Sequence, residues 1–158
     1  MNYTLRLATP ADHDSIYTLK SESVRPYVET IWGWDEAYQR ADFDRDFSAI
    51  QQFQVIEVDG RFVGFVQCCF IPSCCEVVEL HLLPAYRGHG IGSHILRRLQ
   101  EACMAQKLKL RIGCFKDNHR AKQLYEKLGF IQMEETATHY ILETVAPLPN
   151  DDPNELQR

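Results

Sequence analysis

ELHLLPAYRGHGIGS, residues 79–93, is the stretch of the sequence that decides the fold. A strand ends at Pro84, and a helix with one apolar stripe follows the glycines Gly88, Gly90 and Gly92. Glycine lets the backbone approach a ligand closely, and the free N–H groups and dipole at a helix start favour an anion. The stretch therefore predicts a strand, an anion-binding loop and a helix, with a pyrophosphate as the natural ligand.

Two other phosphate-binding motifs do not fit this loop. A Walker P-loop needs a Lys followed by Ser or Thr after its glycines, and none is present. A dinucleotide-binding fingerprint needs a third glycine where Ile95 stands. The loop therefore belongs to neither class of nucleotide-binding site.

Basic side chains are concentrated around the loop. Residues 85–127 carry ten basic and three acidic side chains, or +7, whereas the whole chain carries −5, so the remainder carries −12. The overall negative charge argues against nucleic acid or an anionic membrane as a partner. The basic segment instead suits an anionic small molecule.

Hydropathy and turn residues predict the other strands. Asp59-Gly60 is a strong hairpin turn, and a second turn at residues 71–73 gives three antiparallel strands before the loop. The expected strands are residues 3–8, 53–58, 62–70, 74–83, 108–115, 130–133 and 139–142.

Capping residues and breakers predict the helices. Thr9, Pro10 and Asp12 match the start of a helix that continues to about Lys20. The acidic, aromatic residues 21–50 then hold one or two short helices. Pro26 and Gly33 are expected breaks in this region. Two further helices are predicted, one over residues 90–106 and one that Asn118 caps, that runs through Lys127 and that Gly129 stops. A mixed sheet covered by helices follows.

The composition fits one soluble domain. The chain has 158 residues, of which 45% are hydrophobic and 25% charged. We expect a single domain over residues 1–145 and a disordered, proline-rich tail over residues 146–158. The longest uncharged run, residues 62–75, is too short to span a bilayer, and the first residues lack a secretory signal. A cytoplasmic location is therefore expected.

Six cysteines do not predict a metal site or a disulfide framework. Cys68-Cys69 and Cys74-Cys75 are adjacent pairs on strands, where neighbouring side chains point to opposite faces. We expect all six to be buried small hydrophobic residues in a reducing compartment. No metal is expected.

The loop resembles that of the GNAT superfamily of acetyl-CoA-dependent acyltransferases. Its pattern, Q/R-x-x-G-x-G/A, is matched by Arg87, Gly90 and Gly92, after a strand at residues 78–84. A second matching stretch, N-x-x-A-x-x-x-Y-E-K-L-G-F, begins at Asn118. The resemblance implies an α/β (α+β) fold in one domain, with a mixed, mostly antiparallel sheet flanked by helices. It also implies acetyl-CoA as the co-substrate.

The resemblance also implies which residues hold coenzyme A. The backbone at Leu82 and Leu83 would pair with the pantetheine arm as an added strand does, and Asn118 would touch the arm. Basic side chains would pair with the phosphates: Arg87, Lys116, Arg120 or Lys122. The pyrophosphate would lie on the amides of Gly88, His89, Gly90, Ile91, Gly92 and Ser93.

Acetyl transfer to an amine requires a base, because an alkyl amine with a pKa near 10.4 is mostly ammonium at neutral pH. Glu79, on the strand before the loop, stands where similar enzymes place an acidic residue, and it can act through water. His81 shares its face by the two-residue period of a strand and can act instead of Glu79 or with it. The alternative is that Glu79 is a strand-edge carboxylate paired with an arginine.

Tyr125 is the candidate acid. Coenzyme A departs as a thiolate, which a phenol with a pKa near 10 can protonate, and the resemblance places this hydroxyl at the thioester sulfur. The alternative is a core aromatic, because helical spacing puts Tyr125 on one side with Ala121 and Leu128.

The acceptor is predicted only as a class. An acidic, aromatic pocket suits a cation, and the expected pocket holds Tyr27, Trp32, Trp34 and Tyr38 among acidic residues. A small amine, an amino acid or a peptide amine all fit. The alternative function is a non-catalytic acyl-CoA-binding regulatory module. By resemblance, a homodimer is plausible.

Overall fold

One mixed sheet organises the computed structural model, which describes residues 1–145. Its strand order is β1-β2-β3-β4-β5-β7-β6. Neighbours are antiparallel except β4 and β5, which run parallel, as the expected mixed, mostly antiparallel sheet requires. The strands are β1 (Thr4–Leu7), β2 (Phe53–Val58), β3 (Arg61–Ile71), β4 (Cys74–Leu82), β5 (Lys109–Phe115), β6 (Ile131–Glu135) and β7 (His139–Glu143). The predicted tail at residues 146–158 lies outside the described residues.

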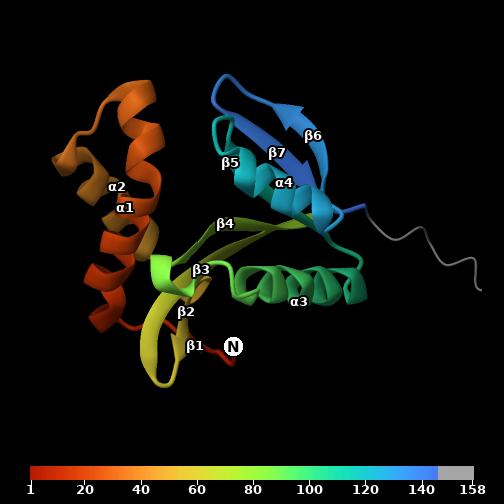
Figure 1. The fold of residues 1–158 in the computed structure, drawn as a ribbon, viewed down its shortest axis with the longest axis horizontal. Helices are drawn as coiled ribbons and strands as arrows, with labels where there is room; N and C mark the ends of the chain where they lie inside the picture. Colours follow the sequence, from red (N-terminus) through yellow and green to blue (C-terminus); the bar gives the residue numbers. More distant parts are fainter. Residues whose placement is uncertain (146–158) are drawn as a thin grey trace, which may run out of the picture.

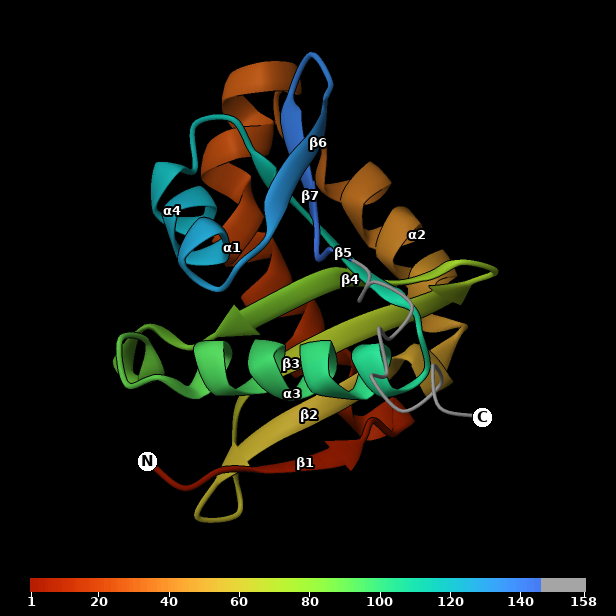
Figure 2. The same ribbon diagram turned by 90° about the vertical axis from the view of Figure 1, so that its right-hand side faces the viewer.

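Helices cover both faces of the sheet. The pair α1 and α2 lies on one face, and α3 and α4 lie on the other (Figures 1 and 2). The helices are α1 (His13–Trp32), α2 (Glu36–Phe47), α3 (Ile91–Ala105) and α4 (His119–Lys127), with short 3-10 turns at η1 (Pro10–Asp12), η2 (Ile50–Gln52) and η3 (Pro84–Tyr86). Within the described residues, every helix is too short or too polar to cross a bilayer.

The predictions that the first helix ends near Lys20 and that Pro26 is a break are wrong. Helix α1 runs through Pro26 for 20 residues and ends at Gly33, whose φ is +78° and whose N–H donates to the Glu29 carbonyl. Proline removes one main-chain hydrogen bond from a helix, but Pro26 is exposed, so water can satisfy the carbonyl that loses its donor. The consequence is one long, continuous helical face against the sheet.

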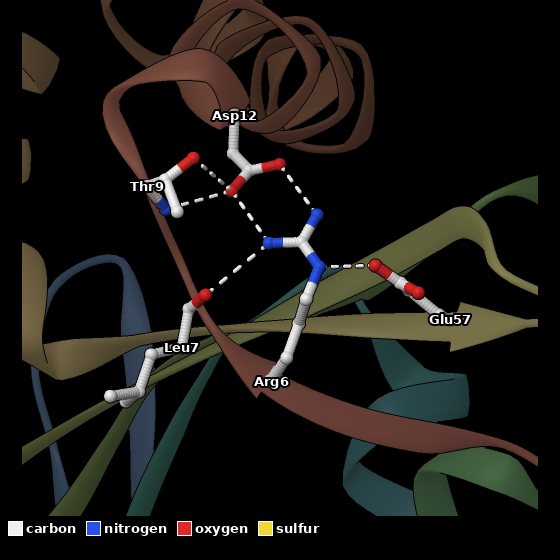
Figure 3. A network of polar contacts seen from close by, with 5 residues as sticks. All are labelled: Arg6, Leu7, Thr9, Asp12 and Glu57. Carbon is white, nitrogen blue, oxygen red and sulfur yellow. Dashed lines mark hydrogen bonds and ion pairs between the residues drawn. The ribbon is translucent and has the colours of Figure 1, made fainter.

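The start of α1 is fixed to the sheet by a polar network (Figure 3). Arg6 of β1 makes two hydrogen bonds of 2.8 Å to the Asp12 carboxylate and also contacts Glu57 of β2. The same Asp12 carboxylate accepts the Thr9 backbone N–H at 2.8 Å. Bidentate geometry of this kind specifies orientation as well as adding energy. The network therefore fixes the end of β1 and the first turn before α1.

Apolar side chains fill both layers. Between the sheet and α3 and α4 the buried core includes Leu96, Leu110 and Leu142, and on the α1 side it includes Phe43 and Phe65. Four cysteines are buried and Cys68 and Cys69 are half-buried, all of them as free thiols. Among residues 1–145, no group of three His, Cys, Asp or Glu side chains is arranged to hold a metal ion.

A β-bulge in β4 changes which face its side chains occupy. Gln67 pairs with Glu79 and the next residue of β3, Cys68, pairs with Val77, so Val78 is an extra residue. Val77 packs in the core under α3, and strict alternation would send Glu79 to the same face. The extra residue reverses the alternation, so Glu79 and His81 point toward α1 while Leu80 packs on the α3 side.

The parallel strands separate beyond the bulge. β4 and β5 pair only from Cys74 to Val77 and from Lys109 to Ile112. Beyond these residues β4 continues with β3 alone, and β5 continues with β7. The sheet therefore opens at its middle, and one edge of β4 is left without a partner strand.

Candidate active site

A cavity of about 460 Å³ lies where β4 and β5 separate. Side chains from both faces of the sheet line it, because the opening passes between the two helical layers. From the α1 side the lining includes Lys20, Ser23, Tyr27, Glu79, His81 and His139, and from the α4 side it includes Asn118, Ala121 and Tyr125. The predicted base candidates and the predicted acid therefore share one cavity.

Glu79 and His81 form a close pair in this cavity. His81 Nε2 lies 2.5 Å from Glu79 Oε2, and each side chain is 18% exposed. The bulge places both on the α1 face, where the His81 ring packs on Phe65 at a centroid distance of 5.5 Å. An ionised carboxylate only accepts hydrogen bonds, so Nε2–H donates and Nδ1 of a neutral ring is left as an acceptor. The alternative in which Glu79 pairs with an arginine is not what the structure shows, because its partners are His81 and Lys20.

Glu79 is held in its ionised form. Burial raises the pKa of this carboxyl, but the hydrogen bond and charge of His81 and the charge of Lys20 lower it by more. The net pKa lies below the usual value for glutamate. The pair therefore presents a carboxylate rather than a carboxylic acid to the cavity at neutral pH.

Tyr125 reaches the cavity from α4 as a protonated phenol. Burial raises the pKa of Tyr125, and nearby Cys114 and Glu79 raise it further. Its ring also packs on Phe130, with centroids 5.9 Å apart, and contacts the core under α4. The structure thus gives Tyr125 both a packing contact and a place in the cavity, so the two predicted roles do not exclude each other.

The glycine loop is open on the side where a ligand would lie. Gly88 and Gly90 have φ values of +77° and +85°, and Gly90 is the N-cap of α3. A Cβ built at Gly88, Gly90 or Gly92 meets no atom within 4 Å. The positive φ values explain two of these glycines, and the open space leaves room for phosphate oxygens near the first turn of α3.

Of the two residues expected to pair with the pantetheine arm, only Leu82 keeps its backbone toward the open edge. The Leu83 N–H donates to the Val63 carbonyl at 2.8 Å, so it is used within the sheet, and the expectation for Leu83 needs correction. Alternate residues of an antiparallel strand direct their main-chain groups to opposite sides, which leaves Leu80 and Leu82 facing the gap. The Leu82 carbonyl accepts from Arg87 Nε at 2.9 Å.

Comparison with known proteins decides the family. Residues 14–130 match the family model described as the acetyltransferase (GNAT) family. The chain belongs to this family. It is therefore an acyltransferase of the GNAT type, and its fold class and its enzyme class are as the sequence predicted.

Relatives of this GNAT acetyltransferase agree with the assignment. A Bacillus subtilis (strain 168) protein with a provisional assignment as a [ribosomal protein bS18]-alanine N-acetyltransferase is 26% identical over 121 residues, which are 75% of this chain and 74% of that one. An N-acetyltransferase of Archaeoglobus fulgidus is 29% identical over 133 residues, 73% of this chain and 86% of its own.

Solved structures share the fold. The PaiA N-acetyltransferase of Thermoplasma acidophilum, in complex with coenzyme A, superposes with a TM-score of 0.71 at 19% identity and covers 91% of this chain and 99% of that one. The ribosomal-protein-S18-alanine N-acetyltransferase of Escherichia coli gives 0.69 at 15% identity, covering 96% and 98%.

Asn118 has a structural role in the GNAT acetyltransferase besides the predicted cofactor contact. Its Oδ1 accepts the Ala121 N–H at 3.2 Å and so caps α4, as the sequence predicted. The cap occupies the carbonyl oxygen of the amide and leaves its NH2 group, which can donate. Asn118 lines the cavity, so both roles fit one side chain.

Two of the basic residues expected at the phosphates are engaged elsewhere. Lys116 contacts Glu135 at 2.5 Å and Lys122 contacts Glu126 at 3.4 Å, and both ammonium groups lie over the Tyr140 ring. Arg87 lies directly beside the glycine loop in the sequence and hydrogen-bonds to the end of β4. Arg87 is therefore the basic residue that the structure ties to the loop.

Of the aromatic residues predicted for the acceptor pocket, only Tyr27 lines the cavity of this acetyltransferase. Trp34 donates to Glu36 at 2.8 Å and lies under Arg25, while Trp32 and Tyr38 are 63% and 59% exposed. Trp32 is the last residue of α1, Trp34 lies between α1 and α2, and Tyr38 lies in α2, so none of the three reaches the cavity lining.

Sequence reasoning missed several residues that line the cavity beside Tyr27. Tyr27 stacks on Phe115 at 5.0 Å, and Phe115 packs on His139 at 4.2 Å. Burial lowers the pKa of His139, against an opposite effect of Glu79, so this imidazole is neutral at neutral pH. Lys20 and Ser23 were also missed, although Lys20 stands three residues before Ser23 and seven before Tyr27, a spacing that places all three on one helical face.

Proposed function

We propose that the protein transfers an acetyl group from acetyl-CoA directly to a primary amine. One observation carries the proposal: the Glu79–His81 pair and the Tyr125 phenol line a single cavity that opens through the sheet. An acceptor entering from the α1 side and a thioester entering from the α4 side would meet there. Direct transfer requires such a meeting point, because both reactants must be bound at once.

The chain offers a place for each part of acetyl-CoA. The open loop from Gly88 to Ser93 suits the pyrophosphate, and the unpaired edge of β4 at Leu80 and Leu82 suits the amide-containing pantetheine arm. Asn118 stands at the cavity and can donate to the same arm. The Thermoplasma acidophilum relative of the same fold was solved with coenzyme A, which supports this choice of co-substrate.

Glu79 and His81 act together as the base in this proposal. The amine nitrogen attacks the thioester carbonyl carbon, and the pair takes the proton that the nitrogen must lose. Two titratable groups 2.5 Å apart titrate as a unit, so the proton belongs to the pair. Nδ1 of His81 is the atom of the pair that can take this proton, because Nε2–H already donates to the carboxylate.

Tyr125 supplies the other proton. The carbon–sulfur bond breaks as the amide forms, and the phenol protonates the departing thiolate. Burial keeps this phenol protonated at neutral pH, so it is ready to donate. The reaction then balances as one proton taken from nitrogen and one given to sulfur.

Free thiol released from acetyl-CoA is the decisive measurement. We expect release with at least one member of an amine panel made of free alanine, butylamine, 1,4-diaminobutane and a peptide that begins with alanine. The peptide is included because the Bacillus subtilis relative has a provisional assignment to alanine on a ribosomal protein. Binding of acetyl-CoA without release for any amine would favour the non-catalytic acyl-CoA-binding module. Cytoplasmic location and homodimer formation stay predictions.

Glu79→Gln tests the base. We expect turnover to fall on the order of a hundredfold with acetyl-CoA affinity unchanged, because general-base catalysis is typically worth that much. Raising the pH should partly restore the rate, since more of the amine is then already neutral. Parental turnover by Glu79→Gln at neutral pH would remove Glu79 from the mechanism and leave His81 or a water chain.

A further inference from the structure

Lys20 of α1 contacts the same carboxylate that His81 contacts. Lys20 Nζ lies 3.6 Å from Glu79 Oε1, while His81 Nε2 lies 2.5 Å from Glu79 Oε2. Each carboxylate oxygen thus has its own cationic or N–H partner. A carboxyl group held at both oxygens has a defined rotation as well as a defined position.

Other contacts hold Lys20 in this place. Its ammonium group lies 3.8 Å from Asp46 Oδ2 of α2 and 5.8 Å from the centre of the Phe43 ring. The side chain is only 17% exposed, although lysine is usually found on the surface. A half-buried lysine that bridges α1, α2 and β4 is a built feature of the cavity wall.

We propose that Lys20 is a positioning residue, which orients the Glu79 carboxylate toward His81 and keeps the pair ready to accept a proton. The inference rests on the proposed function, because it assigns Lys20 to the base of that reaction. Lys20 acts through Glu79.

Among the charged groups around the Glu79–His81 pair, Lys20 is the cation that contacts the Glu79 carboxylate. The titratable and charged groups that face the pair are Lys20 and Tyr27 from α1, Asp46 from α2, Glu76 from β4, Arg111 and Cys114 from β5, Tyr125 from α4 and His139 from β7. Arg111 is held by Glu143 at 2.9 Å, and Tyr125 and His139 are uncharged at neutral pH. Glu76 and Asp46 are the other carboxylates in this set, and Lys20 is the cation in direct contact with Glu79.

The test is the pH dependence of kcat/KM for Lys20→Met, measured with the most active amine of the panel. An opposite charge at this distance lowers a carboxyl pKa by about one to three units. Losing the charge of Lys20 should therefore move the acidic limb of the profile to higher pH by about one unit. At the pH of the parental midpoint the rate should fall several-fold, and well above the limb it should return near the parental value. Methionine fills a similar volume, so the fold is kept.

Two matched variants separate charge from shape. Lys20→Arg keeps the positive charge and should leave the limb within a few tenths of a unit of the parent. Asp46→Asn removes the other partner of Lys20 and should not move the limb upward. An unmoved limb in Lys20→Met, or an equal shift in Lys20→Arg, would overturn the inference. A raised KM for the acceptor with an unmoved limb would instead make Lys20 a substrate-binding residue.

A second measurement does not depend on turnover. The titration of the Glu79 side-chain carboxyl carbon, followed by carbon-13 NMR without substrates, should shift its midpoint upward by about one unit in Lys20→Met. An unshifted midpoint contradicts the inference even if Glu79 is the base. Parental activity of Glu79→Gln contradicts the proposed base instead, so the two failures are distinguishable.

Discussion

The Glu79 carboxylate shows how one residue depends on its contacts. A carboxyl group taken out of water tends to take up a proton, because the charged form loses solvation. Burial acts in this direction on Glu79, yet the net pKa lies below the usual value, because His81 and Lys20 outweigh burial. Without either partner, burial alone would raise the pKa of this carboxyl.

For Tyr125 the two roles predict different mutants. Tyr125→Phe keeps the ring and loses the hydroxyl, so turnover should fall a hundred- to ten-thousandfold while the melting temperature and the acceptor KM stay near the parental values. Tyr125→Ala should also lower the free energy of unfolding by about 3 to 5 kcal/mol, because it removes a ring that packs on Phe130. Turnover assays and thermal melts of both variants decide the matter. Near-parental turnover by Tyr125→Phe would reduce Tyr125 to a packing role.

Gly90 tests the loop. A branched side chain at a φ of +85° is strained, and its Cβ would project into the space left for phosphate oxygens, so Gly90→Val should abolish stabilisation by acetyl-CoA. In the parent a ligand at about 100 times its dissociation constant adds roughly 2.7 kcal/mol to the free energy of unfolding, and a melting curve resolves this easily. NADH and ATP serve as control ligands, with much smaller shifts expected for the parent. A folded Gly90→Val protein that responds like the parent would exclude the loop from the site.

At the scale of elements, the sequence predicted which residues form strands better than it predicted where they face. The turn at Asp59-Gly60, the cap at Asn118 and the stop at Gly129 are local signals, and the elements they bound are present. The bulge at Val78 depends on pairing with β3, which no local pattern reveals. His81 was nevertheless placed correctly with Glu79, because both residues follow the bulge and the two-residue period holds between them.

Helix α1 shows the opposite failure, in which a local rule was applied too strongly. Ending the first helix near Lys20 and reading Pro26 as a break hid the helical spacing of Lys20, Ser23 and Tyr27. Tertiary packing of the buried side of α1 outweighs the loss of one hydrogen bond on its exposed side. Lys20 and Ser23 were missed because of this misreading, whereas Phe115 and His139 lie on β5 and β7, which only the fold brings to the cavity.

The junction of β1 and α1 should set part of the acid stability. The hydrogen bond from Arg6 lowers the pKa of the Asp12 carboxyl to about 2, against 3.8 as the ordinary value. Because the folded-state value is the lower one, the ionised carboxylate stabilises the fold above about pH 4, and the effect disappears as the pH falls to about 2. Asp12→Asn should therefore lower the free energy of unfolding by about 2 kcal/mol at neutral pH. Denaturant titrations of both proteins should converge at low pH, and a constant difference down to pH 2 would contradict the assignment.

At the scale of the whole molecule, the separation of two parallel strands joins two otherwise independent layers. The α1 layer carries Lys20 and Tyr27, the α3 and α4 layer carries the loop and Tyr125, and the cavity between β4 and β5 connects them. Sequence order alone indicated the cofactor half, since its residues lie close together from Glu79 to Phe130. The acceptor half draws on α1, β4, β5 and β7, which only the fold brings together.

The uneven distribution of charge should appear in how acetyl-CoA binding responds to salt. The chain as a whole is negative and would repel an anionic co-substrate, but residues 85–127, which include the loop, carry +7. Salt shortens the screening length from about 10 Å at 0.1 M to about 3 Å at 1 M, so attraction of this kind weakens as salt is added. We therefore expect the Kd of acetyl-CoA to rise several-fold between about 0.1 M and 1 M sodium chloride. S-acetylpantetheine, which lacks the phosphates, is the matched control, and its Kd should change little over the same range of salt. If the two compounds respond equally, the basic segment does not attract the co-substrate, and the loop amides and the open edge of β4 account for binding by themselves.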